Sequence, residues 1–322
     1  MEKEQIAEEL HKQIVNNIQI DTTNNCGSKC WYCPVRYFQR PTYGGPMPKD
    51  IFRDILKQVK ELQEENIVTR HPTVWLSAYG DPLMDPYLED RLLALREFPL
   101  RIPIVTNGIG IQSNLAILSG FTDVIGNYSI NLPAGNPQDY LNYTMNSEKT
   151  FERIISGIIT LSRFVLPNTI NVNVNGAYDD EFAREQLKVP LPEGDTSKQV
   201  EQLTKIFEDY SIKVDDARPL CDRAGILKDV AINNSAPLCR AVWNLPIGST
   251  VVKGCNAGAR LFNFMHVTNS GGMIICCQDY YEYFTFGYLA EDSMRDIWFS
   301  DMHIEAIYDS MRSMCLKCQF AL

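Results

Sequence analysis

The sequence predicts an α/β fold, a partial (β/α)6 TIM-like barrel followed by a small C-terminal unit of a β-hairpin plus helix. Two observations predict it. Strand-like and helix-like segments alternate between about residues 16 and 215, which indicates parallel βαβ units. After about residue 235 the alternation stops. About six strands are too few for the eight of a full barrel, so we expect a partial one.

The elements of the first part follow in chain order. A polar helix at 3–13 comes first, and Pro48 and Asp50 open a helix whose apolar residues recur at helical spacing. The predicted strands are 16–21, 73–78, 101–106, 122–131, 169–175 and 211–215. The further helices are 86–96, 111–119, 149–164 and 197–209, with a long loop at 176–196.

The C-terminal part has its own signals. Asn269-Ser270-Gly271-Gly272 separates two apolar runs, 262–267 and 273–278, and predicts a hairpin. Ser293 is a good N-cap for a helix that starts at Met294 and buries Trp298, and a second helix follows at about 301–312. We therefore divide the chain into a helical extension (1–15), a core (16–234) and a C-terminal domain (235–322).

Composition restricts the class of protein. The chain has 322 residues, of which 45% are hydrophobic, and a net charge of -10. The acidic balance disfavours non-specific binding to nucleic acid or an anionic membrane. The polar start is not a secretory signal, and the most apolar stretch, 154–167, is too short to span a bilayer. We expect a cytoplasmic protein with no nucleic-acid or membrane partner.

Ten cysteines accompany only four histidines. Without an export signal, metal ligation explains them better than disulfides, and thiolate-rich ligation is typical of zinc or iron–sulfur sites. Three of them lie in Cys26-Gly-Ser-Lys-Cys30-Trp-Tyr-Cys33, directly after the first strand. Three thiolates can hold a [4Fe–4S] cluster and leave one iron open for a ligand. A structural zinc site that borrows a fourth ligand is the alternative.

The C-x3-C-x2-C spacing, with an aromatic residue before the third cysteine, resembles the radical S-adenosylmethionine (radical SAM) superfamily. Tyr79-Gly80-Asp81-Pro82 ends the second strand, where that family usually carries Gly-Gly-Glu-Pro. Thr106-Asn107-Gly108 ends the third strand, and Ser129 lies in the fourth. The resemblance covers about residues 16–220.

The resemblance implies a function for each of these positions. The open iron would bind the amino and carboxylate groups of S-adenosylmethionine, and the reduced cluster would cleave it to a 5′-deoxyadenosyl radical that abstracts a substrate hydrogen atom. The implied cluster ligands are Cys26, Cys30 and Cys33. The implied cofactor contacts are Gly80 and Asp81 to the ammonium, Tyr32 to the adenine, and Thr106, Asn107 and Ser129 towards the ribose and carboxylate.

A second cysteine pattern, Cys255-x15-Gly271-x4-Cys276 followed by Cys315-x2-Cys318, resembles the first half of a SPASM domain, the truncated form called a twitch domain. It implies an auxiliary [4Fe–4S] cluster with four cysteine ligands that transfers electrons. A four-cysteine zinc ribbon is the alternative.

Three cysteines remain, Cys221, Cys239 and Cys277. Buried free cysteines are usually apolar core residues. Cys277 follows a proposed ligand and would point to the opposite face of an extended strand. We take it as a candidate hydrogen donor to a product radical. Either of Arg218 and Arg223 is a candidate to bind a carboxylate.

The two resemblances together imply an oxidoreductase-type radical SAM enzyme that uses a flavodoxin- or ferredoxin-type reductant. The expected reaction is dehydrogenation or epimerisation of a small sugar- or cyclitol-like metabolite, with loops 132–148 and 176–196 forming the pocket. The alternatives are a maturase that modifies a ribosomally made peptide and a non-enzymatic, zinc-stapled binding protein.

Overall fold

The computed structural model describes residues 1–30, 33, 44–77, 79–98, 100–174, 197–216, 252, 255, 260–279 and 281–317. Strands and helices alternate through the first part as predicted. The strands are β1 (Val15–Ile20), β2 (Val68–Trp75), β3 (Ile102–Thr106), β4 (Ile125–Asn131), β5 (Ile170–Val174) and β6 (Ile212–Asp216). The helices are α1 (Lys3–Lys12), α2 (Lys49–Glu64), α3 (Leu88–Glu97), α4 (Leu115–Gly120), α5 (Pro137–Thr144), α6 (Glu148–Ser162) and α8 (Ser197–Ile206).

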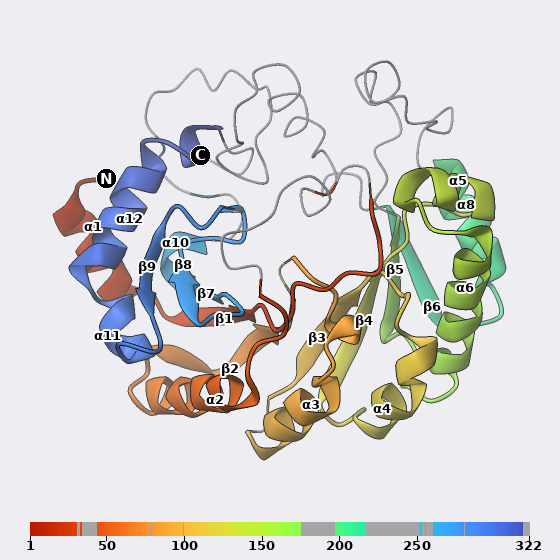
Figure 1. Cartoon of the computed structure of the whole chain (residues 1–322), viewed down its shortest axis with the longest axis horizontal. Helices are drawn as coiled ribbons and strands as arrows, with labels where there is room; N and C mark the ends of the chain where they lie inside the picture. The colour runs from red at the N-terminus through yellow and green to blue at the C-terminus, as the bar shows by residue number, and fades with distance from the viewer. Residues whose placement is uncertain are drawn as a thin grey trace.

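These strands form an open, curved wall with helices on its outer side (Figure 1). β3, β4, β5 and β6 form one parallel sheet in that order, and β1 pairs in parallel with β2 in a second sheet. β2 and β3 lie side by side but share no ladder of hydrogen bonds. The arrangement confirms the partial barrel, and it brings the carboxyl ends of the strands to one rim.

The C-terminal part extends the sheet of the core. Its elements are α10 (Arg260–Asn263), β7 (Phe264–Val267), β8 (Gly272–Ile274), β9 (Thr285–Tyr288), α11 (Met294–Trp298), α12 (Asp301–Met311) and the 3-10 turn η5 (Cys315–Lys317). β7 pairs in parallel with β1, so that Ile18 lies opposite Met265. The hairpin is confirmed, with Gly271 at φ +84°, a conformation that favours glycine. β9 completes the sheet and was not predicted.

Local capping explains the helices, including one that was not predicted. Ser293 caps α11 through a hydrogen bond from the Asp296 amide, and Trp298 is buried, both as expected. Helix α5 lies within the segment 132–148, which was expected to be a loop. Asn136 accepts a hydrogen bond from the Asp139 amide at 2.9 Å, and proline occupies the first turn. Asn-Pro before a helix is a start signal, so the sequence contained the information.

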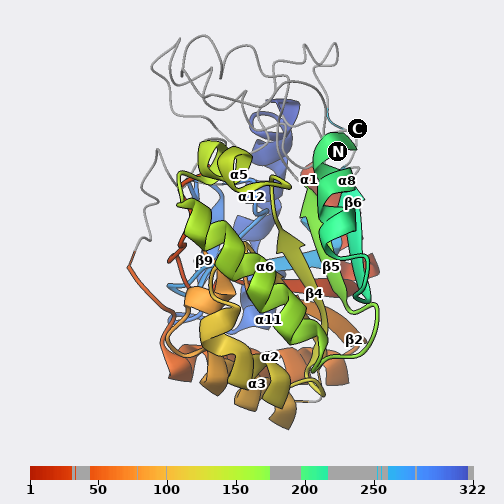
Figure 2. The same cartoon turned by 90° about the vertical axis from the view of Figure 1, so that its right-hand side faces the viewer.

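The two faces of the β3–β6 sheet differ. Tyr128, Ile130 and Val172 are buried on the outer face, which α6 crosses in Figure 2. The alternate residues, Ser129 and Asn173 among them, are only half-buried on the inner face. The polar inner face therefore lies beside the rim where the strands end. Within the described ranges, no helix has the length and apolarity needed to cross a membrane.

Candidate cofactor sites

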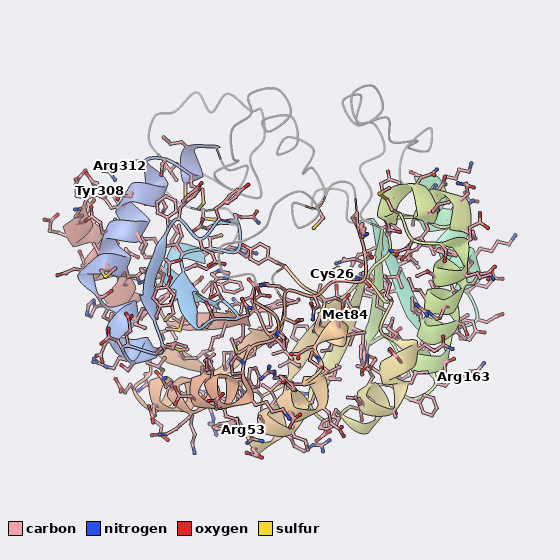
Figure 3. The ribbon with its side chains drawn as sticks, in the orientation of Figure 1. Cys26, Arg53, Met84, Arg163, Tyr308 and Arg312 are labelled. Atoms are coloured by element: carbon pink, nitrogen blue, oxygen red, sulfur yellow. The ribbon has the colours of Figure 1, made fainter. Side chains whose placement is uncertain are left out.

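The first cysteine motif lies on the loop after β1, at the rim. The Asp81 amide donates to the Asn25 carbonyl at 2.8 Å, and the Lys29 amide donates to the Thr144 carbonyl at 3.1 Å. These bonds tie the loop to the end of β2 on one side and to α5 on the other. Cys26 is exposed in the middle of the molecule (Figure 3), and Cys30 and Cys33 are half-buried. The three cysteines therefore lie together on the loop at the rim.

Asn107 connects this loop to the end of β3. Its side-chain amide donates to the Cys26 sulfur at 3.3 Å. Although the residue as a whole is exposed, its sulfur is withdrawn from water, which together with the nearby Asp81 charge raises the pKa of Cys26 to about 12. Without a metal the thiol is protonated at neutral pH, and metal binding would release that proton.

Asp81 is almost fully buried, and donors of the chain occupy both of its carboxylate oxygens. The Leu83 amide, the Asn107 amide and the Thr106 hydroxyl donate to it at 2.8–2.9 Å. Burial raises the pKa of Asp81, while these hydrogen bonds act in the opposite direction. The carboxylate thus braces the turn after β2 against the end of β3. In this arrangement it does not point outward to a ligand.

Gly80 lies against the backbone of the first loop. A Cβ at this position would be 1.9 Å from the Thr23 carbonyl oxygen, a distance that no side chain tolerates. Only glycine permits this approach, which leaves the backbone of the turn at the rim next to the cysteine loop. The combination of three thiols with a backbone turn fits a thiolate-bound cluster with a ligand beside it.

Ser129 belongs to a hydrogen-bonded row on the inner face. Asn173 donates to the Ser129 hydroxyl at 2.7 Å, and Asn171 donates to the Asn173 side-chain oxygen at 3.3 Å. The register places Ser129 opposite Asn171 and Asn131 opposite Asn173. Sequence reasoning found Ser129 and missed the two asparagines on β5, although alternation of Asn with Ile and Val in β5 was visible in the sequence.

The second motif gathers at the end of β8. The Arg260 guanidinium donates to the Cys277 sulfur at 2.9 Å, and its electrostatic partners are Cys277, Cys276 and Cys255. The Cys276 thiol also interacts with the Cys277 thiol, which together with burial raises the pKa of Cys276. The expectation that they face opposite sides is wrong, because β8 ends at Ile274 and the alternation of a strand does not reach them. Gly271 makes the turn as predicted.

Cys315 and Cys318 are the other two cysteines of the second pattern. Cys315 is buried in η5, where its thiol lies 3.8 Å from the Ser310 hydroxyl. Several predicted positions lie outside the described residues: Tyr32, Cys221, Cys239, Cys318, Arg218, Arg223 and the loop 176–196. Among the residues that are described, no three His, Cys, Asp or Glu side chains converge tightly enough to hold a single metal ion.

Tyr79 connects the two motifs, which sequence reasoning did not anticipate. It directly precedes Gly80 and is buried, and its hydroxyl donates to the backbone carbonyl of Cys277. The turn beside the first cysteine loop is therefore in direct contact with the loop of the second. No signal in the sequence pairs these two positions, because they are 198 residues apart.

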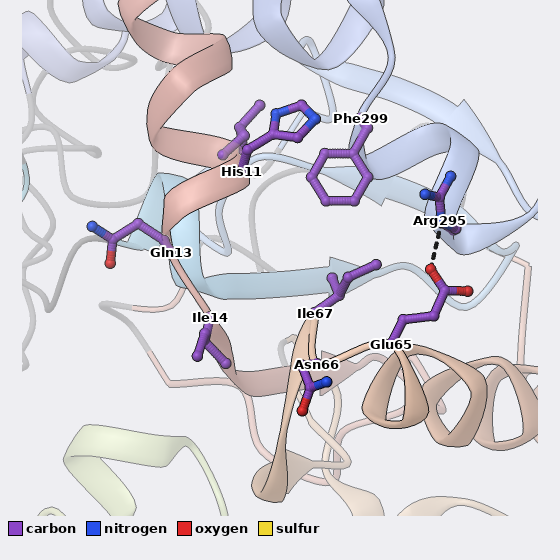
Figure 4. Close-up of a pocket in the computed structure, with 9 residues that line it drawn as sticks. His11, Gln13, Ile14, Glu65, Asn66, Ile67, Arg295 and Phe299 are labelled. Atoms are coloured by element: carbon purple, nitrogen blue, oxygen red, sulfur yellow. Dashed lines mark hydrogen bonds and ion pairs between the residues drawn. The ribbon is translucent and has the colours of Figure 1, made fainter.

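A surface pocket of about 330 Å³ lies away from both motifs (Figure 4). It lies between α1, the turn after α2 and the end of α11, and the Arg295–Glu65 ion pair of 2.7 Å lies at one side. None of the predicted site residues lines it.

Comparison with known proteins agrees with the two motifs. The family model of the radical SAM superfamily matches residues 20–185, just over half of the chain, and that of an iron–sulfur cluster-binding domain, SPASM, matches residues 255–319. The S-adenosyl-L-methionine-dependent 2-deoxy-scyllo-inosamine dehydrogenase of Niallia circulans is 20% identical over 291 residues, which are 90% of this chain and 84% of that protein.

Solved structures share the fold. BtrN in complex with AdoMet and 2-DOIA has a TM-score of 0.54 and 14% identity, with 96% of this chain and 93% of that chain covered. Streptococcus suis SuiB bound to S-adenosylmethionine has a TM-score of 0.54 and 15% identity, with 98% and 74% covered. The chain belongs to the radical SAM superfamily: it is an enzyme that binds a [4Fe–4S] cluster and S-adenosylmethionine and carries a C-terminal iron–sulfur cluster-binding domain.

Proposed function

We propose that this enzyme is an oxidoreductase that dehydrogenates or epimerises a small, polyhydroxylated metabolite of the sugar or cyclitol type. One observation carries the proposal: the accessible inner face of β4 and β5 presents neutral hydrogen-bonding groups. These groups are Ser129, Asn131, Asn171 and Asn173. The side-chain oxygen of Asn171 is buried and accepts no hydrogen bond within the described part of the chain.

Neutral amides suit a neutral polyol. Each amide offers donors and an acceptor, and a substrate hydroxyl needs both kinds of partner. A site built to bond hydroxyl groups also rejects analogues that lack them, because its buried polar groups would then be unpaired. The named activity of the Niallia circulans relative, a dehydrogenase of 2-deoxy-scyllo-inosamine, supports the same class of substrate.

In the proposed site the first loop holds the cluster through Cys26, Cys30 and Cys33. When bound, the reduced cluster supplies the electron that cleaves S-adenosylmethionine and produces the radical that abstracts a substrate hydrogen atom. The backbone of the Gly80–Asp81 turn binds the ammonium group of the cofactor, while the Asp81 carboxylate keeps that turn fixed against Thr106 and Asn107.

The other cofactor contacts are assigned as the sequence suggested. Tyr32 contacts the adenine, and Asn107 and Ser129 line the ribose and carboxylate side. Asn107 has a second function in this proposal, since its amide bonds the sulfur of Cys26. A flavodoxin or ferredoxin of the cytoplasm is the proposed reductant.

The second motif holds the auxiliary cluster through Cys255, Cys276, Cys315 and Cys318. Dehydrogenation requires an acceptor for the second electron of the substrate, and a fully ligated cluster is suited to that task. Epimerisation requires instead a hydrogen atom returned to the substrate. Cys277 is the proposed donor for that branch, because it is a thiol next to the ligands and not one of them.

A ribosomal peptide is the second candidate substrate. SuiB has also been solved with its precursor peptide SuiA, and that structure has a TM-score of 0.54 with 14% identity. The Lys213–Asp215 pair of 2.9 Å at the β6 edge of the inner face supports it, since exposed charges can bind a peptide backbone or termini. The neutral row on β4 and β5 favours the polyol.

The test is anaerobic turnover with S-adenosylmethionine and a panel of cyclitols and amino sugars deuterated at each carbinol carbon. We expect 5′-deoxyadenosine that carries deuterium from one position, and a ketone or an epimer as product. Asn171→Leu should raise KM for the polyol by about tenfold, which corresponds to one lost hydrogen bond to a buried group. Asn127→Ala, at the far end of β4 on the same face, is the matched control. Deuterated peptides are assayed in parallel, and deuterium transfer from the peptides alone would favour the second candidate.

A further inference from the structure

Arg260, the first residue of α10, is the positive charge of the second cysteine site. Its guanidinium lies 2.9 Å from the Cys277 sulfur, and Cys276 and Cys255 are its other electrostatic partners. The Phe264 ring lies 5.0 Å from the centre of the guanidinium. The hydrogen bond to Cys277 and the Phe264 ring hold the cation in place, where it also interacts electrostatically with Cys276 and Cys255.

No carboxylate compensates this charge within the described residues. The electrostatic partners of Arg260 there are thiols, and its Nε atom is buried without a hydrogen-bond acceptor. Asp279 follows Cys277 by two residues, and its carboxylate accepts from the Tyr283 and Phe284 amides. A cation partly withdrawn from water is unfavourable unless an anion is close to it.

The neighbouring histidine does not add to the charge. His266 is buried, bonded to Gln19 at 2.9 Å and stacked on Phe264. Burial, with a smaller effect of Arg260, keeps the pKa of His266 well below its usual range. The histidine is therefore neutral, and Arg260 supplies the positive charge on this side of the site.

A thiolate-bound [4Fe–4S] cluster carries net negative charge, which becomes more negative on reduction. Net charge and hydrogen bonds to sulfur are among the factors that set its potential. A fixed cation beside the sulfurs favours the more negative state and so raises the reduction potential. We propose that Arg260 sets the potential of the auxiliary cluster and makes it a better electron acceptor.

This inference rests on the proposed assignment of Cys255 and Cys276 as ligands of the auxiliary cluster, and it needs no knowledge of the substrate. In it, Arg260 acts on the cluster through its positive charge. Arg260 has no contact with substrate in this proposal. A purely structural arginine would change the amount of bound iron and leave the potential of the remaining cluster unchanged.

The experiment uses the full chain with Cys26, Cys30 and Cys33 replaced by alanine, so that only the auxiliary cluster contributes a signal. The protein is reconstituted without oxygen, its iron and sulfide are counted, and its midpoint potential is measured by titration with a redox mediator and electron paramagnetic resonance. The same measurement is made with Arg260→Gln, Arg260→Lys and, as the matched control, Arg295→Gln, which removes an exposed cation of the same domain.

We expect a lower midpoint potential in R260Q at unchanged iron content, and potentials close to the parent in R260K and R295Q. An unchanged potential in R260Q, or an equal drop in R260K, would overturn the inference. If R260Q does not retain iron, the midpoint potential of R260K is the test. A potential equal to that of the parent supports charge as the cause, and a lower potential contradicts it. Failure of the parent to bind iron would overturn the ligand assignment itself, while a failed substrate panel leaves this result untouched.

Discussion

The two cysteine sites differ in exposure and in the charge next to them. In the first, Cys26 is exposed and Cys30 and Cys33 are half-buried on a loop at the open rim. In the second, Cys276, Cys277 and Cys315 are buried, and Cys255 is intermediate. An accessible site can exchange a ligand, whereas an enclosed site is suited to electron transfer, in which no ligand has to enter.

The neighbouring charges have opposite signs. Burial and, second to it, the Asp81 carboxylate raise the pKa of Cys26, whereas the Arg260 cation attracts the second group of thiols. An anion disfavours the reduced form of a cluster, and a cation favours it. With the clusters bound as proposed, the one at the rim would be the stronger reductant and the enclosed one the better acceptor, and Tyr79 joins the two loops.

The largest expected effect comes from replacing one cysteine of each site and comparing the two variants. Cys30→Ala should abolish cleavage of S-adenosylmethionine, a loss of at least about a thousandfold, because it removes a ligand of the open cluster. Cys276→Ala should retain cleavage and lose the second cluster. Iron should fall from about eight per chain to about four in both variants. Retained cleavage in C30A would contradict the assignment of the first site.

The second prediction concerns the close approach at the rim. Gly80→Ala should lower the free energy of unfolding by about 3 kcal/mol and weaken cofactor binding, because the new methyl group would meet the Thr23 carbonyl. Urea unfolding and calorimetric titration with S-adenosylmethionine measure the two effects. Gly120→Ala is the matched control, since nothing lies within 4 Å of its Cβ position. Equal stability of the two variants would show that the turn can move.

Much of the fold was predictable because it follows from local patterns. Alternating apolar residues and N-caps identified nearly every element of the core. Ser293 was recognised by its capping side chain and Gly271 by its backbone preference. The pairing of β7 with β1 was not predictable. It joins segments about 250 residues apart, and the sequence of neither strand specifies its partner.

The site was predictable where spacing encodes chemistry. The cysteine motifs and the Tyr79-Gly80-Asp81-Pro82 turn are short and contiguous, so the sequence contains them whole. The direction of the Asp81 carboxylate was not predictable, because it depends on donors that Thr106 and Asn107 contribute from another strand. Arg260 was missed for the same reason: an arginine becomes informative only when its unpaired charge meets the thiols.

The third prediction tests whether Asp81 holds the turn after β2 in place or binds the cofactor directly. Asp81→Asn should lower the free energy of unfolding by about 2 kcal/mol, because hydrogen bonds to a buried carboxyl group are lost. Thr106→Val, which removes one donor of the same group, should lower it in the same direction. Both should weaken cofactor binding in proportion to the loss of stability. Weaker binding in D81N at unchanged stability would mean that the carboxylate contacts the cofactor directly.

The smallest expected effect tests how well the C-terminal part of the molecule excludes water, through the buried His303. His303 on α12 is buried, its Nδ1 lies 2.7 Å from the Trp298 carbonyl, and its ring stacks on Phe286 at 3.9 Å. Burial lowers the pKa of His303 to about 4, so the folded state holds this ring neutral. The unfolded chain takes up the proton near pH 6.5, and stability is therefore lost as the pH falls from about 6.5 towards 4.

The size of this effect follows from the slope of the unfolding free energy against pH. Each pH unit below about 6.5 should cost about 1.4 kcal/mol of unfolding free energy from this residue. Anaerobic urea unfolding at pH 7.5, 6.5 and 5.5 measures it, and His303→Gln should show a smaller loss between pH 6.5 and 5.5 than the parent. His266 contributes with the same sign, so the difference between variant and parent isolates His303. An equal loss of unfolding free energy in parent and variant would mean that water reaches the His303 ring. The second cysteine site would then be no better shielded from water than the first.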